Sequence, residues 1–290
     1  MRNVKQIYRA NSQHWVGDGF LVQPLFSHMG EDRGTNPFLM LDYAAPYEFS
    51  PNEARSPRGV GQHPHKGFET VTIAYHGEVA HRDSSGGGGI IYEGDVQWMT
   101  AGSGIIHEEF HSENFSKQGG LFEMVQLWVN LPAKDKNTQP RYQHLAKAGI
   151  PVVELPDEAG CLRLIAGEYK GVKGAADTFT EMNVWDIVLN ANKKAVLEIP
   201  EAHNLSMVVL RGNVTLNGKE QAGAGQLVGF EKSGGNVHIE ADSEEVKILL
   251  LSGVPIDEPV VGYGPFVMNT AEEIRQAISD FKSGKFGGID

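Results

Sequence analysis

Short apolar runs of strand length, bounded by glycine, asparagine, aspartate or proline, recur along almost the whole chain. They include, in chain order, Phe20–Phe26, Phe38–Tyr43, Thr70–Tyr75, Phe122–Leu131, Asn204–Leu210, Gln226–Phe230 and Glu245–Gly253. Few of these runs are long enough for a helix, and their boundaries are typical of strands joined by tight turns. Glycine supplies 35 of 290 residues without a collagen-like period, well above its usual share of about 7%. The pattern therefore predicts an all-β protein.

The two halves of the chain share a spacing. Gly94 and His107 are 13 residues apart, and so are Gly225 and His238. Each of these histidines begins a His-x-Glu triplet and follows a run that reads as a strand. A repeated period of this kind indicates a duplicated β unit of roughly 130 residues.

A change in composition marks the expected boundary between the two units. The stretch Asn130–Leu145 is rich in polar residues, contains two prolines and lacks periodicity, so we interpret it as a linker. We expect one domain over residues 1–132 and a second over residues 133–290. Near the end of the chain, Thr270 and Glu273 fit a capping box that predicts a C-terminal helix. The apolar side chains of that helix share one face: Ile274, Ala277, Ile278 and Phe281.

Charge and cysteine content exclude several classes of protein. The formal net charge is −12 and no run of lysine or arginine is present, which argues against direct nucleic-acid binding. Cys161 is the single cysteine, so internal disulfides and cysteine-rich metal sites are excluded. No apolar stretch approaches the roughly 20 residues of a membrane span or resembles a signal peptide. We expect a cytoplasmic protein without a membrane partner, and a monomer because the duplication already supplies a partner sandwich.

Histidines are concentrated in the expected strands of the first half, at positions 63, 65, 76, 81, 107 and 111. His63 and His65 are two residues apart, so on a strand both imidazoles point to one face and could reach one metal ion. His107 and Glu109 have the same spacing beyond a glycine-rich turn, and Glu108 would face the other way. Three imidazoles and one carboxylate suit Fe(II), Mn(II), Ni(II), Cu(II) or Zn(II) and leave positions open for substrate or oxygen.

Two points about this cluster stay open from sequence. Glu69 has the same strand parity as His63 and His65, so it competes with Glu109 as fourth ligand or supports the ligands from behind. The plainer alternative is that these are surface histidines on hairpins. In addition, aromatic and sulfur-containing residues of neighbouring runs could line a substrate pocket or belong to the core: Trp98, Met99, Met124 and Trp128.

The segment His107–His111 also matches the HExxH motif of zinc metalloproteases. That motif requires a helix that places both histidines one turn apart. Gly102 and Gly104 precede the segment and two isoleucines lead into it, so the local sequence favours a strand. We therefore disfavour the protease interpretation.

The second half lacks an equivalent His-x-His pair. Counted back from the hairpin glycine Gly212, the positions that correspond to this pair are Glu198 and Pro200. We expect the C-terminal unit to be a jelly roll with a degenerate site and a structural role.

Three long motifs together resemble the pirin family of proteins with two cupin domains: HPHKGFETV from His63, GDVQWMTAGSGIIHEE from Gly94 and GPFVMNT from Gly264. The resemblance extends over nearly the whole chain. It implies two stacked β-sandwich cupin domains, of which the N-terminal one (1–132) binds one divalent metal ion, commonly iron as Fe(II), and the C-terminal one (133–290) is degenerate. The implied ligands are His63, His65, His107 and Glu109. General cupins instead use a glutamate four residues after the second histidine, here Glu69.

The resemblance also implies an activity. Bacterial members of the family are expected to act as quercetin 2,3-dioxygenases, metal-dependent oxidoreductases that open the flavonol ring with O₂ and release carbon monoxide. On this expectation the partners are a flavonol-like substrate and O₂, and Glu109 or Glu69 takes the proton of the flavonol 3-hydroxyl. Eukaryotic pirins imply an alternative, a non-enzymatic metal- or redox-sensing regulator that acts through protein partners. The acidic charge permits such a partner.

Overall fold

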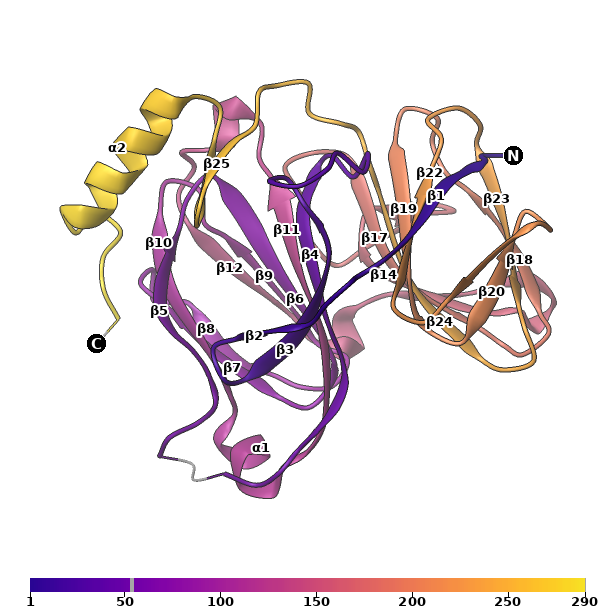
Figure 1. Ribbon diagram of the computed structural model, residues 1–290, viewed down its shortest axis with the longest axis horizontal. Coiled ribbons are helices and arrows are strands. Elements are labelled where there is room, and N and C mark those ends of the chain that lie inside the picture. Colours follow the sequence, from indigo (N-terminus) through magenta and orange to yellow (C-terminus); the bar gives the residue numbers. More distant parts are fainter. Residues whose placement is uncertain (53–54, 290) are drawn as a thin grey trace. The chain divides into compact units, whose positions relative to one another are not determined.

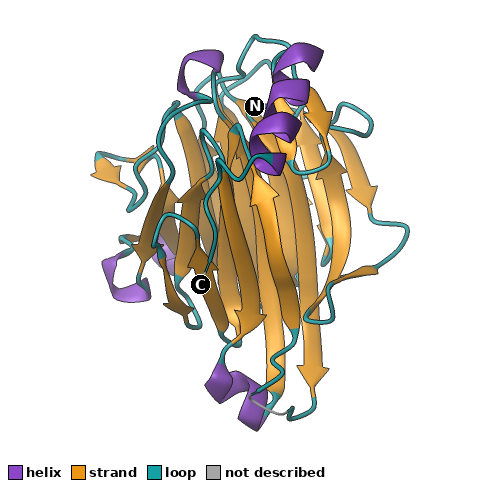
Figure 2. Cartoon of the chain, turned by 90° about the vertical axis from the view of Figure 1, so that its left-hand side faces the viewer, coloured by secondary structure: helices purple, strands orange, loops and turns teal. Residues whose placement is uncertain are grey.

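Strands dominate the computed structural model, which describes residues 1–52 and 55–289, and helices are few (Figures 1 and 2). Every apolar run named above overlaps a strand of the structure. The all-β prediction is confirmed. Among the described residues, no helix has the length and apolar character needed to cross a membrane.

The strands divide into two compact units. The histidine-rich unit comprises residues 12–31, 38–147 and 256–290 and holds nine of the eleven histidines. The apolar unit comprises residues 1–11, 32–37 and 148–255. Neither unit is a continuous half of the chain, so this division differs from a single cut between residues 132 and 133.

The N-terminal strand explains part of that difference. Strand β1 (Val4–Arg9) pairs antiparallel with β22 (Gln226–Phe230) and forms an edge of a sheet in the apolar unit (Figure 1). Local periodicity cannot reveal this pairing, because it depends on hydrogen bonds between segments more than 200 residues apart.

The C-terminal segment belongs to the histidine-rich unit. Strands β25 (Val261–Tyr263) and β26 (Phe266–Met268) form a hairpin that leads into helix α2 (Ala271–Lys282). Thr270 caps the helix, and its Oγ1 accepts a hydrogen bond from the Glu273 amide at 3.2 Å. The predicted C-terminal helix and its cap are therefore confirmed. Its apolar face packs with β26 and Ile106 in one cluster.

Two antiparallel sheets form the body of the histidine-rich unit. Their strands are β2 (His14–Val16), β3 (Phe20–Ser27), β4 (Phe38–Phe49), β5 (Gly59–His65), β6 (Phe68–His76), β7 (Val79–Asp83), β8 (Gly88–Ile91), β9 (Val96–Thr100), β10 (Ile105–His111), β11 (Gly120–Asn130) and β12 (Arg141–Leu145). One sheet has the order β12-β9-β6-β11-β4-β3-β2, and the other has the order β5-β10-β7-β8. Apolar side chains from both sheets pack together, including Val22, Ala74, Val79 and Ile91.

The interpretation of residues 130–145 as a linker is wrong. After a short 3₁₀ turn, η1 (Ala133–Asp135), the chain forms β12, which pairs with β9 from Arg141 opposite Thr100 to Leu145 opposite Val96. This strand is polar because it lies at an edge of its sheet. A short helix that the sequence analysis missed, α1 (Glu113–Gln118), begins after the cap residue Ser112.

The apolar unit repeats the same plan. Its strands are β1, β13 (Val152–Glu154), β14 (Gly160–Ala166), β17 (Met182–Leu189), β18 (Lys194–Glu198), β19 (Asn204–Arg211), β20 (Asn213–Leu216), β21 (Glu220–Gly223), β22, β23 (Asn236–Ala241) and β24 (Val246–Gly253), with a small hairpin of β15 (Glu168–Tyr169) and β16 (Val172–Lys173). The large sheet has the order β1-β22-β19-β24-β17-β14-β13, and the small sheet has the order β18-β23-β20-β21. The small sheets of the two units match strand for strand, which confirms the predicted duplication.

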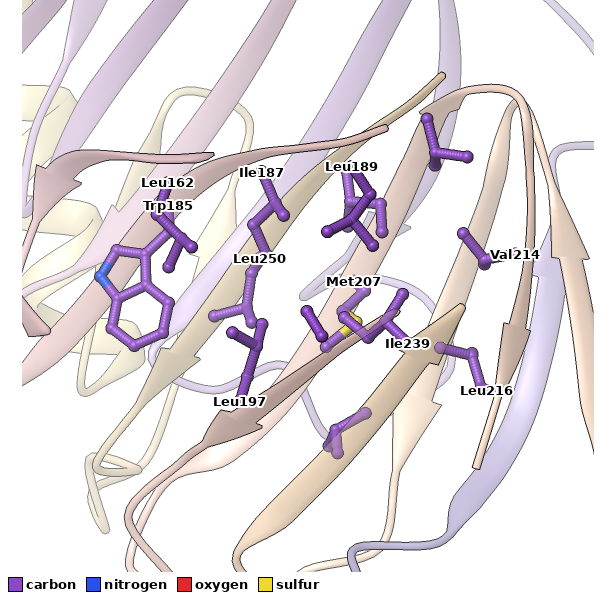
Figure 3. Packing of buried hydrophobic residues seen from close by; sticks show 14 of the residues in the cluster. Leu162, Trp185, Ile187, Leu189, Leu197, Met207, Val214, Leu216, Ile239 and Leu250 are labelled. Carbon is purple, nitrogen blue, oxygen red and sulfur yellow. The ribbon is translucent and has the colours of Figure 1, made fainter. Parts of the chain in front are cut away.

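The interior of the apolar unit is a continuous hydrophobic core. Buried side chains from both sheets form one cluster, labelled in Figure 3: Leu162, Trp185, Ile187, Leu189, Leu197, Met207, Val214, Leu216, Ile239 and Leu250. Burial of a leucine, isoleucine or valine side chain stabilises a fold by about 1.5–3 kcal/mol relative to its exposure. This unit therefore needs no metal ion to account for its packing.

Candidate metal centre

Strands β5 and β10 lie side by side and carry the predicted ligands. In their antiparallel register, His107 is opposite His63 and Ile105 is opposite His65. The register then shifts, so that Glu109 is opposite Val60 and two residues of β5 face one of β10. This arrangement is a β-bulge, a device that re-aims side chains beside functional sites.

Three predicted residues come together at this strand pair. Potential ligand atoms of His63, His65 and His107 lie within 4.8 Å of one another. Nε2 of His63 is 2.8 Å from Nε2 of His107. The His65 ring lies 4.9 Å from the His63 ring and 4.7 Å from the His107 ring, measured between centroids. The three imidazoles therefore converge on one point of the interior.

The proton positions suit a metal ion. His63 Nδ1 is 2.8 Å from the carbonyl oxygen of Gly61, which can only accept, so Nδ1 carries the proton and Nε2 keeps its lone pair. Burial, followed by repulsion from neighbouring imidazoles, lowers the pKa of both His65 and His107 well below its usual value. Nδ1 of His65 is buried without a hydrogen-bond partner among the described residues. Neutral imidazoles with converging lone pairs are the donors that a divalent metal requires, so this group fits one.

Glu109 lies beside these histidines and is 7% exposed. Its Oε1 accepts hydrogen bonds from Thr72 Oγ1 at 3.0 Å and from Gln97 Nε2 at 3.1 Å. Together with His81 and His107 it forms a second group of potential ligand atoms within 4.8 Å. The structure thus places Glu109 next to His107 but in a separate group from His63 and His65, and its role as the fourth ligand stays a prediction.

The other two glutamates of interest have different surroundings. Glu108 faces away from the cluster, as predicted, and accepts hydrogen bonds from Arg82. Glu69 accepts a hydrogen bond from Thr100 Oγ1 at 2.7 Å, and burial raises its pKa to about 7. Within the described part of the chain, Glu69 belongs to neither group of potential ligand atoms. A role for Glu69 as ligand or base stays a prediction.

A cavity of about 260 Å³ opens beside the cluster and is lined by His63, His65 and Glu109. Most of its remaining wall is apolar: Val16, Phe20, Val22, Met40, Val60, Met124, Trp128 and Pro265. Two polar residues, Asp42 and Gln126, complete the wall, and burial raises the pKa of Asp42. Of the residues considered for a pocket from sequence, Met124 and Trp128 line this cavity, whereas Trp98 and Met99 are fully buried.

The zinc-protease alternative is wrong. Residues 107–111 lie on strand β10, so the two histidines of the HExxH segment are not one helical turn apart. Nε2 of His111 lies 2.9 Å from the carbonyl oxygen of Gly19. The ring packs against four phenylalanines, and burial lowers its pKa to about 4. These are Phe20, Phe49, Phe115 and Phe122. His111 is therefore a core residue.

The sequence did not predict a role for the polar residues that lie behind the three imidazoles. His81, Asp83 and Gln97 are buried and joined by hydrogen bonds, with His81 touching His107. A signal for two of them was present, because His81 and Asp83 are two residues apart on a strand and share a face. Gln97 and Thr72 carried no such signal, since a lone polar residue in an apolar run does not reveal its partner.

In the apolar unit, the strands that correspond to β5 and β10 are β18 and β23, and their inward side chains are apolar. In the register of β18 and β23, Val196 is opposite His238 and Glu198 is opposite Asn236, so Glu198 does not face His238 as His63 faces His107. His238 is exposed. The side chains that face inward on these strands are apolar: Ala195, Leu197, Val237 and Ile239.

Comparisons with known proteins agree with this architecture. A family model described as Pirin matches residues 19–129, and one described as Pirin C-terminal cupin domain matches residues 184–287. A Pseudomonas aeruginosa protein with the provisional name quercetin 2,3-dioxygenase is 53% identical over 286 residues, which cover 99% of each chain. Pirin-like protein 2 of Arabidopsis thaliana is 36% identical over 99% of this chain and 91% of its own. A crystal structure of quercetin 2,3-dioxygenase from Acinetobacter baumannii has a TM-score of 0.95, with 52% identity over the whole of both chains.

Proposed function

The chain belongs to the pirin family, and from that membership we propose that it is a metal-dependent dioxygenase that opens a flavonol such as quercetin with O₂ and releases carbon monoxide. One observation carries the proposal: three imidazoles converge beside an apolar cavity whose wall also contains a carboxylate. A flat aromatic substrate suits such a wall, because Trp128 and Phe20 offer ring surfaces and the polar groups are few.

His63, His65 and His107 would hold the metal, with Glu109 as the fourth ligand. Iron(II) is the proposed ion, and Mn(II), Ni(II), Cu(II) and Zn(II) accept the same donors. When bound, such an ion lowers the pKa of a coordinated hydroxyl and offers open positions for substrate and oxygen. Removal of the ion with a chelator should therefore abolish turnover.

The proton of the substrate hydroxyl goes to Glu109 in this proposal. Thr72 and Gln97 hold its Oε1 through two hydrogen bonds, so in this proposal Oε2 would both ligate the metal and accept the proton. Glu109 lines the cavity with His63 and His65, whereas Glu69 is absent from that wall. Glu109 is thus the better placed of the two carboxylates. The apolar residues around it exclude water and keep the proton transfer between substrate and protein.

The test is quercetin consumption and carbon monoxide release under O₂, measured together with metal content. The wild-type protein is compared with His63→Ala, Glu109→Gln and Glu108→Gln. Glu108 is a matched control, because it is the adjacent glutamate on β10 and faces Arg82. We expect His63→Ala to lose metal and turnover, Glu109→Gln to lose turnover, and Glu108→Gln to retain both.

Two results would contradict the proposal. Absence of turnover in a wild-type protein with a full complement of metal would favour the regulator that acts through protein partners. Equal turnover in Glu109→Gln and Glu108→Gln would remove Glu109 as the base, and a Glu69→Gln variant would then test the other carboxylate.

A further inference from the structure

His81 lies behind the metal-binding face of His107, and both of its ring nitrogens are in hydrogen-bonding distance of buried polar groups. The side chains of His81 and Asp83 on β7 are both 0% exposed. His81 Nε2 is 3.1 Å from Asp83 Oδ2, and its Nδ1 is 3.1 Å from the amide nitrogen of Gln97. A carboxylate accepts and an amide nitrogen donates, so Nε2 carries the proton and Nδ1 presents its lone pair.

That lone pair constrains the next ring. Nδ1 of His107 is 3.4 Å from Nδ1 of His81, a long hydrogen bond. His81 Nδ1 can only accept, so the hydrogen bond between the two rings assigns its proton to His107 Nδ1, and the His81 lone pair is shared between this donor and the Gln97 amide. The other nitrogen of His107, Nε2, is then unprotonated, and this is the atom that lies 2.8 Å from Nε2 of His63.

The far end of this chain of hydrogen bonds is fixed to the backbone. Asp83 Oδ1 accepts from the Ser85 amide at 2.8 Å, from Ser85 Oγ at 2.6 Å and from the Gly87 amide at 3.0 Å. The turn between β7 and β8 therefore holds the carboxylate, which holds His81. Gln97, on β9, reaches both His81 and Glu109 and so links the two sides of the site.

We propose that His81, held by Asp83 and Gln97, is the positioning residue that fixes His107 in the tautomer whose Nε2 binds the metal. The inference rests on the proposed metal site and is independent of the reaction performed there. Direct ligation by His81 is the competing arrangement, since His81, His107 and Glu109 also lie close together. It would require His81 to give up its hydrogen bond to Gln97 or Asp83.

The test uses Zn(II) alone as the probe, with its dissociation constant measured by competition with a chromophoric chelator. His81→Phe removes the acceptor, whereas His81→Asn places Oδ1 where Nδ1 was. His76→Phe is the matched control, because His76 also pairs with a carboxylate, that of Glu93, on an exposed hairpin. We expect His81→Phe to weaken binding about 10–100-fold, His81→Asn to recover part of that loss, and His76→Phe to bind as the wild type does.

A second readout needs no variant. Long-range ¹H–¹⁵N NMR spectra of the Zn(II)-loaded wild-type protein should show the His107 proton on Nδ1. Metal bound at Nδ1 of His107 would overturn the inference, and so would wild-type affinity in a folded His81→Phe protein. If His81→Asn and His81→Phe both lost Zn(II) affinity by far more than ~100-fold, His81 would be a metal ligand. This result would also overturn the inference. A wild-type protein that binds no metal would overturn the proposed site together with this inference.

Discussion

The small sheets of the two units have the same strand order, but one directs polar side chains inward and the other directs apolar side chains inward. In the histidine-rich unit, β5 and β10 direct His63, His65 and His107 inward. In the apolar unit, β18 and β23 direct Leu197 and Ile239 into a hydrophobic core. One fold thus accommodates a polar interior where hydrogen bonds or a metal satisfy the buried nitrogens, and otherwise requires apolar side chains.

The comparison also shows that equal spacing along the sequence does not ensure that two side chains point to the same face of a sheet. His107 and His238 follow their glycines at the same distance, yet His107 is buried and His238 is exposed. His107 pairs with Asp83, six residues after the hairpin glycine Gly77, whereas His238 lies opposite Asn217, five residues after Gly212, so the two strand registers differ by one residue. A slip of one residue moves every side chain of a strand to the opposite face, so the shared His-x-Glu triplet has different surroundings in the two units.

The largest expected effect separates these two histidines. His107→Ala should weaken metal binding by more than about 100-fold, beyond the loss expected for an outer partner, and should abolish turnover. His238→Ala, the matched change at an exposed histidine, should leave both unchanged. Metal content by atomic absorption and a chelator competition assay measure the difference. Equal effects of the two substitutions would contradict the assignment of metal binding to the interior of the histidine-rich unit alone.

A substitution in the apolar unit should instead affect the free energy of unfolding and not metal binding. Leu197→Ala in the apolar core should lower the free energy of unfolding by about 2–5 kcal/mol and leave metal affinity unchanged. Val196 is the adjacent residue on the same strand and is 48% exposed, so Val196→Ala should change stability by less than about 0.5 kcal/mol. Urea denaturation monitored by tryptophan fluorescence measures both. A Leu197→Ala protein with altered metal affinity would show that the interiors are coupled.

A pH dependence is expected from the buried carboxyl of Glu69. Burial raises its pKa to about 7 from a usual value of 4.5, so the folded chain holds an extra proton between these values. The free energy of unfolding should therefore fall as pH rises through that window. Relative to Glu69→Gln, the wild-type protein should lose up to about 3 kcal/mol between pH 5 and pH 8. Urea denaturation of both proteins across this pH range, with a chelator present to remove metal, provides the measurement. A difference in free energy of unfolding that does not change with pH would contradict the prediction.

The smallest expected effect concerns the C-terminal helix of the histidine-rich unit. Thr270→Ala removes the side-chain acceptor for the Glu273 amide and should cost about 1 kcal/mol. Ser279→Ala, on the exposed side of α2, should be neutral or slightly stabilising, because alanine has the higher helix propensity. Thermal unfolding followed by circular dichroism compares them. Equal shifts in Tm would show that the cap contributes nothing specific.

Local pattern was enough to predict an all-β fold, the strands of the apolar runs named at the outset, the duplication, the C-terminal helix and the shared face of His63 and His65. Each of these properties depends on residues a few positions apart, and strand periodicity records which side chains share a face. The same reasoning placed Glu108 on the opposite side from Glu109, as the structure shows.

Only the tertiary structure decided how the distant segments meet. It paired β1 with β22, turned the expected linker into edge strand β12, and brought β26 and α2 against Ile106. It also placed His81 and Gln97 behind His107 and turned His238 outward. These outcomes depend on hydrogen bonds between strands and on one-residue differences in strand register, which local periodicity does not record.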